Sequence, residues 1–190
     1  MIHNYQIIIE YDGTKFVGWQ YQKNGSSIQE ALQKSIKKIL KEKIKIIGAG
    51  RTDAGVHALA QSANFFTKKK IENLKKFQNS VNFFLSKNLI SIKDIKKRKI
   101  EFHSRHDAKE RIYEYKITNR DSTIALNKNR SWLIKKNIDI NILKRGSKIL
   151  IGKHDFSTFR SSSCSARSAV KYMNNVKISK IGENITIEFR

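Results

Sequence analysis

The order of periodic segments in the first hundred residues constrains the fold of this chain more than any other feature. Residues 2–11 read as a strand, and the spacing of Ser27 and Glu30 is that of a capping box at the start of an amphipathic helix extending to about residue 42. Further elements are expected as strands at 44–49 and 58–66, a helix at 71–85 and a strand from residue 89. This βαββαβ order is typical of a ferredoxin-like fold, whose antiparallel sheet has helices on one face and leaves the other face open for a ligand.

The second half of the chain begins the same order again. Residues 109–118 alternate as a strand, Asp139 can cap the following helix, and two strands are expected at about 168–179 and 184–189. The last helix and strand of this second repeat are missing from the sequence. We therefore predict an α+β protein of two ferredoxin-like halves that share one mixed or antiparallel sheet with helices on one face. The halves are expected at residues 1–105 and 106–190, the second being incomplete.

The charge of the chain favours a polyanionic partner. There are 39 Lys and Arg residues against 16 Asp and Glu residues, which gives a formal net charge of +23 at pH 7. Nucleic acid is the commonest partner of so basic a protein. Lys, Ile and Asn are frequent everywhere and proline is absent, so genomic base composition accounts for part of the bias. Charge and motif together, rather than charge alone, point to nucleic acid.

Cysteine usage and hydropathy bear on the compartment. The single cysteine, Cys164, is expected to be a packed or surface thiol, and it excludes an internal disulfide. The chain opens on a strand pattern rather than a secretory leader, and no apolar run approaches the ~18 residues of a membrane span. We therefore expect a cytoplasmic protein that makes no use of a membrane. The five histidines lack ligand spacing, so we expect no metal site.

A glycine-rich segment, residues 48–58 (GAGRTDAGVHA), lies between two of the predicted strands. A two-residue hairpin turn needs only one Asn-Gly or Asp-Gly pair, whereas this segment has three glycines within eight residues. Glycines allow an irregular backbone path that a ligand can approach closely. Arg51 and Asp53 lie within this path, which predicts a functional site. An aspartate in such a turn more often caps backbone amides, so the motif has to support the catalytic interpretation.

A lone carboxylate suits some reactions on nucleic acids better than others. Phosphoryl transfer relies on metal ions or several charged groups, so Asp53 is poorly suited to a nuclease. It can instead attack a glycosidic carbon or add to an electron-poor pyrimidine ring. Either route needs an extruded nucleotide and an aromatic surface to receive its base. Arg111, Tyr113 and Tyr115 fall on one face of the predicted strand 109–118 and would form a basic and aromatic strip.

These residues resemble the tRNA pseudouridine synthase A family, which isomerises uridines at positions 38–40 of the anticodon stem-loop. The block GRTDAGVH is highly specific, and the similarity runs in order along nearly the whole chain. The matching elements are residues 10–13 with 18–20, 48–58 with Gln61, 103–105, 111–115 and 152–160.

The resemblance implies a role for each matching residue. Asp53 would be the nucleophile that attacks the target uridine, and Arg51 would help to flip that nucleotide. The uracil would then rotate and rejoin through its carbon 5, with no cofactor. Tyr113 would stack on the flipped base and assist the final removal of a proton. Further RNA contacts are implied for Arg105, Arg111 and Arg160. The family is dimeric, so the resemblance also implies a homodimer that binds tRNA.

At its C-terminal end the sequence differs from the pattern of the family. In the family, a motif that follows the strand here ending at Phe189 supplies an arginine that pairs with the catalytic aspartate. The sequence ends at Arg190, which does not match that arginine. We therefore expect the second half to lack this segment. Two functions remain open, a tRNA pseudouridine synthase acting through Asp53 and a catalytically impaired RNA-binding module. A metal-dependent nuclease is a distant third, because no second carboxylate neighbours Asp53.

Overall fold

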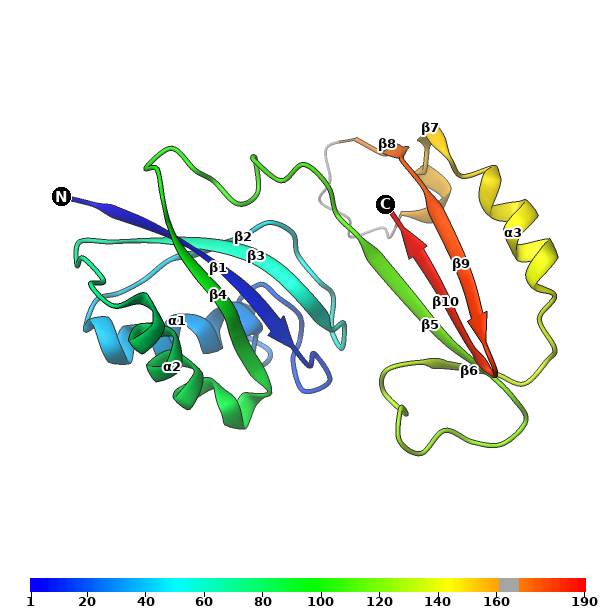
Figure 1. The fold of residues 1–190 in the computed structure, drawn as a ribbon, viewed down its shortest axis with the longest axis horizontal. Coiled ribbons are helices and arrows are strands. Elements are labelled where there is room, and N and C mark those ends of the chain that lie inside the picture. The colour runs from blue at the N-terminus through cyan, green and yellow to red at the C-terminus, as the bar shows by residue number, and fades with distance from the viewer. Residues whose placement is uncertain (161–167) are drawn as a thin grey trace. The chain divides into compact units, whose positions relative to one another are not determined.

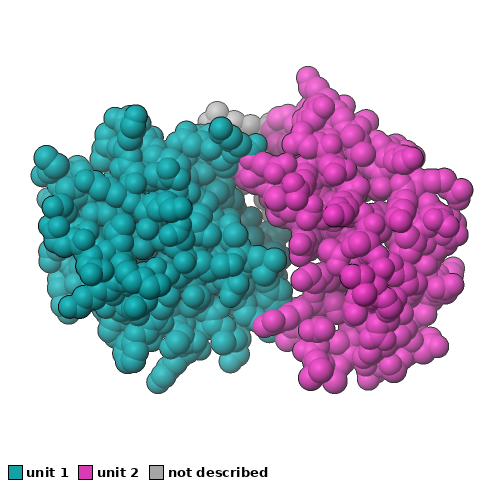
Figure 2. All heavy atoms as spheres, viewed as in Figure 1, with its two compact units in different colours: residues 1–109 teal, residues 110–190 magenta. Residues whose placement is uncertain are grey.

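The chain forms two compact units, Met1–Lys109 and Glu110–Arg190 (Figure 2). The computed structural model describes residues 1–160 and 168–190, so Cys164 lies outside the described residues. The hydrogen bonds group the main strands into two four-stranded sheets, one in each unit, with a small two-stranded sheet in the second. The predicted α+β class is confirmed. Within the described residues, β1 and β5, the first strand of each repeat, each have both of their hydrogen-bonded neighbours in their own unit.

The first unit has the predicted ferredoxin-like order. Its elements are β1 (His3–Tyr11), α1 (Ile28–Leu40), β2 (Ile46–Gly48), β3 (Ala58–Thr67), α2 (Leu74–Leu85), a 3₁₀ turn η1 (Ser86–Asn88) and β4 (Ile90–Arg98). The strands lie in the order β2-β3-β1-β4, and every neighbouring pair is antiparallel. Both helices lie on the same side of this sheet (Figure 1).

Local capping signals define where the helices of the first unit begin and end. The Ser27 hydroxyl accepts a hydrogen bond from the Glu30 backbone N–H at 3.2 Å, as the capping-box spacing predicted. The last residue of α1 is Leu40, and Lys41 is its C-cap. Lys41 has a left-handed φ of 53°, and its backbone N–H donates to the Lys37 carbonyl. Asn73 caps α2 by accepting from the Lys76 N–H at 2.8 Å, a cap that we did not predict.

The core of the first unit lies between its sheet and its helices. Alternate residues of β1 point toward the helices and are buried, among them Ile7 and Ile9 with no exposed surface. Leu32 and Ile36 of α1 are equally buried against them. The other face of the sheet has polar residues at Asn4, Gln6, Ser62 and Asn64, so the two faces differ in character as the sequence alternation requires.

The second unit repeats part of this arrangement. Its elements are β5 (Tyr113–Asn119), β6 (Trp132–Ile134), α3 (Ile140–Lys148), β7 (Gly152–Asp155), a 3₁₀ turn η2 (Ser157–Phe159), β8 (Val170–Met173), β9 (Val176–Ile181) and β10 (Asn184–Phe189). The sheet order is β6-β5-β10-β9, with β6 parallel to β5 and the other pairs antiparallel. Thus β5, α3, β9 and β10 correspond to β1, α1, β2 and β3. Asp139 caps α3 through the N–H groups of Asn141 and Ile142, as predicted.

The strand predicted at 168–179 is in fact two strands that belong to different sheets. β8 pairs with β7, whereas β9 pairs with β10. Between them, the N–H groups of Asn174 and Asn175 both donate to the Arg190 carbonyl. The alternation of side chains continues through this break, which is why the sequence pattern suggested one strand. None of the described helices is both long and apolar enough to cross a membrane.

Substitution of Ser27 by alanine tests the contribution of the α1 cap. The loss of one capping acceptor should lower the free energy of unfolding by about 1 kcal/mol. Urea unfolding followed by tryptophan fluorescence would measure this, in a Trp132→Phe background where the buried Trp19 is the only tryptophan. Ser80→Ala is the matched control, because Ser80 is a half-buried serine inside α2 that caps no helix, and its loss should change stability by less than about 0.5 kcal/mol. Equal losses in both variants would contradict a capping role.

Candidate active site

The loop 49–57 that joins β2 to β3 contains the predicted nucleophile in a tight turn. The Val56 N–H donates to the Asp53 carbonyl at 3.2 Å, which closes a four-residue turn over residues 53–56. Gly55, the third residue of this turn, has a φ of +77°, the value that a type II turn requires at that position and that glycine adopts without strain. The Gln61 side-chain amide donates to the Gly50 carbonyl at 2.5 Å and anchors the start of the same loop.

A second glycine-containing loop, residues 12–19, packs its backbone directly against the loop 49–57. The Trp19 N–H donates to the Thr52 carbonyl at 2.9 Å, and the Gly55 N–H donates to the Phe16 carbonyl at 3.3 Å. At Gly18, φ is +114° and a Cβ would lie 2.6 Å from the Thr52 carbonyl oxygen. A Cβ on Gly13 would overlap the Val56 carbonyl oxygen. The two loops therefore approach each other at distances that only glycine permits.

His57 and Trp19 stabilise this contact rather than project toward a ligand. The Nδ1 atom of His57 accepts a hydrogen bond from the Gly13 N–H at 3.1 Å, in agreement with a hydrogen-bonding role for this histidine in the turn. Trp19 is 2% exposed, and a Cβ on Gly48 would lie 2.6 Å from its indole ring. This burial fits a loop anchor rather than a platform for base stacking.

A pair of hydroxyl groups fixes the residue that precedes the predicted nucleophile. The phenol of Tyr11, at the end of β1, lies 2.8 Å from the Thr52 Oγ1 atom. Burial raises the pKa of Tyr11, and the hydrogen bond with Thr52 opposes that shift in part. The phenol therefore stays neutral in the folded protein, and its contribution to stability is present below the pKa of an unfolded tyrosine and is lost as the pH rises through the raised value. Sequence reasoning missed Thr52 as a positioning residue.

Arg51 and Asp53 are both exposed on this loop. Among the residues that the structure describes, no group donates a hydrogen bond to the Asp53 side chain, and only the main chain of Asp53 is fixed by hydrogen bonds. An exposed carboxylate on a rigid loop is available to a substrate. The adjacent guanidinium of Arg51 and the overall charge of +23 make the surroundings suitable for a phosphate-bearing ligand.

Arg105 lies on the segment that follows β4, and buried amides fasten this segment to the open face of the first sheet. The Ser104 N–H donates to the Asn64 Oδ1 atom at 2.9 Å, and the Asn64 amide donates to the Asn4 Oδ1 atom at 3.0 Å. Asn4 in turn donates to the Phe102 carbonyl at 2.8 Å. Asn4 and Asn64 are almost completely buried, so they position the segment rather than contact a ligand. Polar residues at alternate positions of two strands were the signal that could have revealed them.

The remaining predicted site residues belong to the second unit. Tyr113 begins β5 and is 50% exposed, and Tyr115 lies on the same face of that strand with its ring edge-on to Phe189 at 5.8 Å. The prediction that Arg111 shares this strand face is wrong. β10 ends at Phe189, opposite Tyr113, so it offers no partner strand to Arg111, which lies in the exposed segment before β5. Arg160 follows η2 and is exposed.

The structure thus brings Arg51 and Asp53 together on one loop of the first unit, with Arg105 on a separate segment of that unit, and places Arg111, Tyr113 and Arg160 in the second. Within residues 1–160 and 168–190, no three His, Cys, Asp or Glu side chains come together as a metal site would require. The chemistry available at the loop is that of a carboxylate two residues from a guanidinium.

Comparisons with known proteins agree with the motif. A family model for tRNA pseudouridine synthase matches residues 7–107. The tRNA pseudouridine synthase A of Pelagibacter ubique is 53% identical over 186 residues, which cover 98% of this chain and 76% of that protein. The tRNA pseudouridine synthase A of Neorickettsia sennetsu is 42% identical over 183 residues, with 95% of this chain and 74% of the relative covered. That of a Thermoanaerobacter species is 41% identical over 189 residues, covering 98% and 76%.

Substitution of Gly13 by alanine tests the contact between the two loops. Because the added methyl group would overlap the Val56 carbonyl, the loops must move apart, and the free energy of unfolding should fall by about 1–3 kcal/mol. The Trp19 fluorescence assay measures this change. Thr14→Ala is the matched control, since Thr14 is the exposed neighbour and its side chain can be shortened with little effect. A Gly13→Ala protein as stable as the control would show that the loops are not interlocked as described.

Proposed function

The chain belongs to the tRNA pseudouridine synthase family, a family of isomerases, and we propose that it converts uridine to pseudouridine in the anticodon stem-loop of tRNA, at positions 38–40, with Asp53 as the nucleophile. The observation that carries this proposal is the exposed carboxylate of Asp53, a residue whose main chain is held by backbone hydrogen bonds between two glycine-containing loops. A side chain that serves only to cap a turn would instead accept hydrogen bonds from backbone amides.

The isomerisation requires one bond exchange and one proton exchange. A carboxylate oxygen of Asp53 attacks C1′ of the target uridine, and the new O–C1′ bond forms as the N1–C1′ glycosidic bond breaks. The released uracil rotates, and C5 forms the new bond to C1′ as Asp53 is released. The proton on C5 is then removed and N1 gains a proton, so product and substrate have the same atoms. No step calls for a metal ion or cofactor.

The remaining site residues support the same reaction. Arg51, two residues from the nucleophile, helps to flip the target nucleotide and occupies its place in the stack. Tyr113 stacks on the extruded uracil and its phenol assists the removal of the C5 proton. Its half-exposed ring at the start of β5 is suited to such stacking. Arg105, Arg111 and Arg160 contact the phosphates of the stem-loop. We further propose that the protein acts in the cytoplasm, as a homodimer.

The replacement Asp53→Asn tests the nucleophile. Since an amide cannot form the covalent intermediate, release of tritium from tRNA labelled at uridine C5 should fall on the order of 10³-fold or more. Binding of tRNA, measured by filter retention, should change by no more than about twofold, because one exposed charge contributes little to a complex with many phosphate contacts. Asp121→Asn, an exposed aspartate of the second unit, is the control for loss of one negative charge.

Two results would count against this proposal. Equal tritium release by the Asp53→Asn and wild-type proteins would remove Asp53 from the mechanism. An absence of release by the wild-type protein, with salt-sensitive tRNA binding retained, would instead favour an RNA-binding module without catalysis.

A second pair of variants tests the phenol of Tyr113. In Tyr113→Phe the aromatic ring remains but the hydroxyl is lost, so affinity for tRNA should persist while kcat falls about 100-fold, as expected when a general base is removed. Tyr115→Phe is the matched control on the same strand face and should retain its kcat. Single-turnover tritium release at saturating protein gives the rate, and an unchanged rate in Tyr113→Phe would restrict Tyr113 to stacking.

A further inference from the structure

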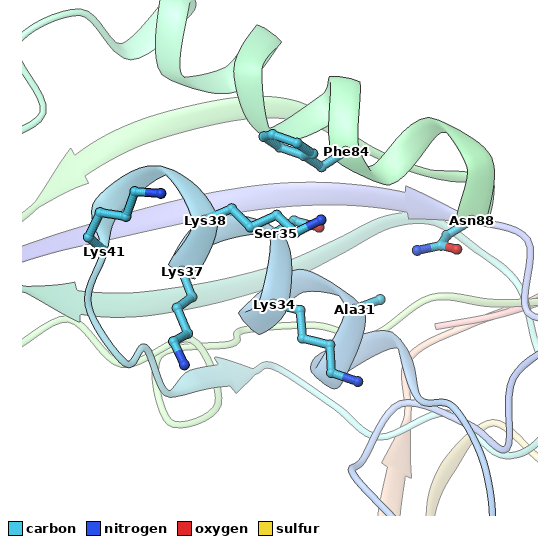
Figure 3. A pocket seen from close by; sticks show the side chains of 8 residues that line it. All are labelled: Ala31, Lys34, Ser35, Lys37, Lys38, Lys41, Phe84 and Asn88. Atoms are coloured by element: carbon cyan, nitrogen blue, oxygen red, sulfur yellow. The ribbon is translucent and has the colours of Figure 1, made fainter.

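A groove of about 620 Å³ lies between α1 and α2, on the helical side of the first unit. Ala31, Lys34, Ser35, Lys37, Lys38 and Lys41 of α1 and its cap line it together with Phe84 of α2 and Asn88 of η1 (Figure 3). The volume is within the usual range of a ligand site. None of these residues belongs to the loops that hold Asp53.

The four lysines follow the period of the helix. Lys34, Lys37, Lys38 and Lys41 occupy positions i, i+3, i+4 and i+7, which places them along one side of α1. At 1.5 Å per residue, they span only about 10 Å of the helix axis. In the part of the chain that the structure describes, Glu30 pairs with Lys34 at 2.6 Å, and no carboxylate pairs with the other three lysines. The stripe is therefore a concentrated and largely uncompensated positive charge.

The wall across the groove from Lys38 is aromatic, whereas Lys34 and Lys37 point away from α2 (Figure 3). Phe84 is 38% exposed, and the Lys38 Nζ atom lies 4.8 Å from the centre of its ring. Phe83, the preceding residue, is 76% exposed, with its ring edge-on to that of Phe84 at 5.4 Å. Lysines beside exposed aromatic rings are the combination with which proteins bind a nucleic acid strand, since the cations contact phosphates and the rings contact bases or ribose.

A purely structural role explains only part of this arrangement. Lysines in the last turn of a helix interact favourably with its dipole, and Lys37 and Lys38 lie in the last turn of α1. That interaction needs neither a concave surface nor exposed phenylalanines on the neighbouring helix. The i, i+3, i+4, i+7 spacing is also that of the solvent-facing side of α1, because Leu32 and Ile36 are buried on the opposite side. The groove and the exposed phenylalanines are therefore what a solvated helix face leaves unexplained.

We propose that this α1–α2 groove is a second RNA-binding site, which holds the phosphodiester backbone of a tRNA strand away from the nucleotide that reaches Asp53. Lys37, Lys38 and Lys41 contact successive phosphates, and Phe84 supports the ribose or base between them. The proposal depends on the proposed function only in taking tRNA as the RNA. The groove would increase the affinity for the body of the tRNA, and this contribution does not depend on catalysis.

The salt dependence of binding tests the groove. A triple variant, Lys37→Gln, Lys38→Gln and Lys41→Gln, removes three charges but keeps good helix formers. Each lost phosphate contact lowers the slope of log K against log salt by about 0.7–0.9, so the slope should fall by about 2 to 3. The matched control substitutes the exposed run Lys68, Lys69 and Lys70 with glutamine, which removes the same net charge elsewhere in the first unit. Its slope should fall by less than about 1. Equal reductions in the two triple variants would overturn the proposal, because total charge alone would then explain binding.

A measurement on the unaltered protein guards against misfolding of the variant. Acetylation of lysines with a water-soluble reagent, read by mass spectrometry, should slow at least about fivefold at Lys37, Lys38 and Lys41 when an unmodified tRNA transcript is added, and remain unchanged at Lys68 and Lys69. Unprotected groove lysines in a saturated complex would refute the site. The Asp53→Asn protein serves as a second sample. If tRNA protects the groove lysines of the Asp53→Asn protein but the wild-type protein releases no tritium, the groove is an RNA-binding site and the proposed reaction is rejected. If the wild-type protein releases tritium but the groove lysines are not protected, the reaction stands and the groove site is rejected.

Discussion

The close contact between two glycine-containing loops is the constraint on which the candidate site depends. Backbone hydrogen bonds join the loop 12–19 to the loop 49–57 at Trp19–Thr52 and Phe16–Gly55. The space between the two loops leaves no room for a Cβ atom at Gly13 and too little room for one at Gly18. Asp53 is consequently fixed through its main chain, so its carboxylate is left available for a substrate.

The rest of the first unit supports this contact. β1 ends at Tyr11, whose buried phenol meets Thr52, and the burial of Ile7 and Ile9 beneath the helices fixes the position of that strand. The main hydrophobic core lies entirely within the first unit. In the described part of the second unit, by contrast, the fully buried apolar side chains are few (Ile117, Val176 and Ile185), while exposed aromatic side chains are frequent. The unit that carries the proposed nucleophile thus has the well-packed core, and the unit that carries the proposed stacking surface has the exposed aromatic rings.

The order of elements in the first unit was predictable because its signals are local. The Ser27–Glu30 spacing and the alternation along β1 identified α1 and β1 without knowledge of their neighbours. Prediction failed where pairing partners decide the outcome. Val170, Tyr172, Val176 and Ile178 keep one phase of alternation across the polar pair Asn174 and Asn175, yet β8 and β9 pair with different strands. Arg111 continues the alternation of β5, but β10 reaches only as far as Tyr113. Alternation indicates which residues can form a strand, and hydrogen-bonding partners determine which residues do.

The glycine-rich segment with Arg51 and Asp53 was recognisable in the chain alone, because glycine spacing and a lone carboxylate are properties of consecutive residues. The tie between Tyr11 and Thr52 joins residues 41 positions apart, and that between Asn64 and Ser104 joins residues 40 apart. The α1–α2 groove likewise needs two helices side by side before Lys38 lies over the Phe84 ring. Such features follow from packing between distant segments, which no local pattern of side chains specifies.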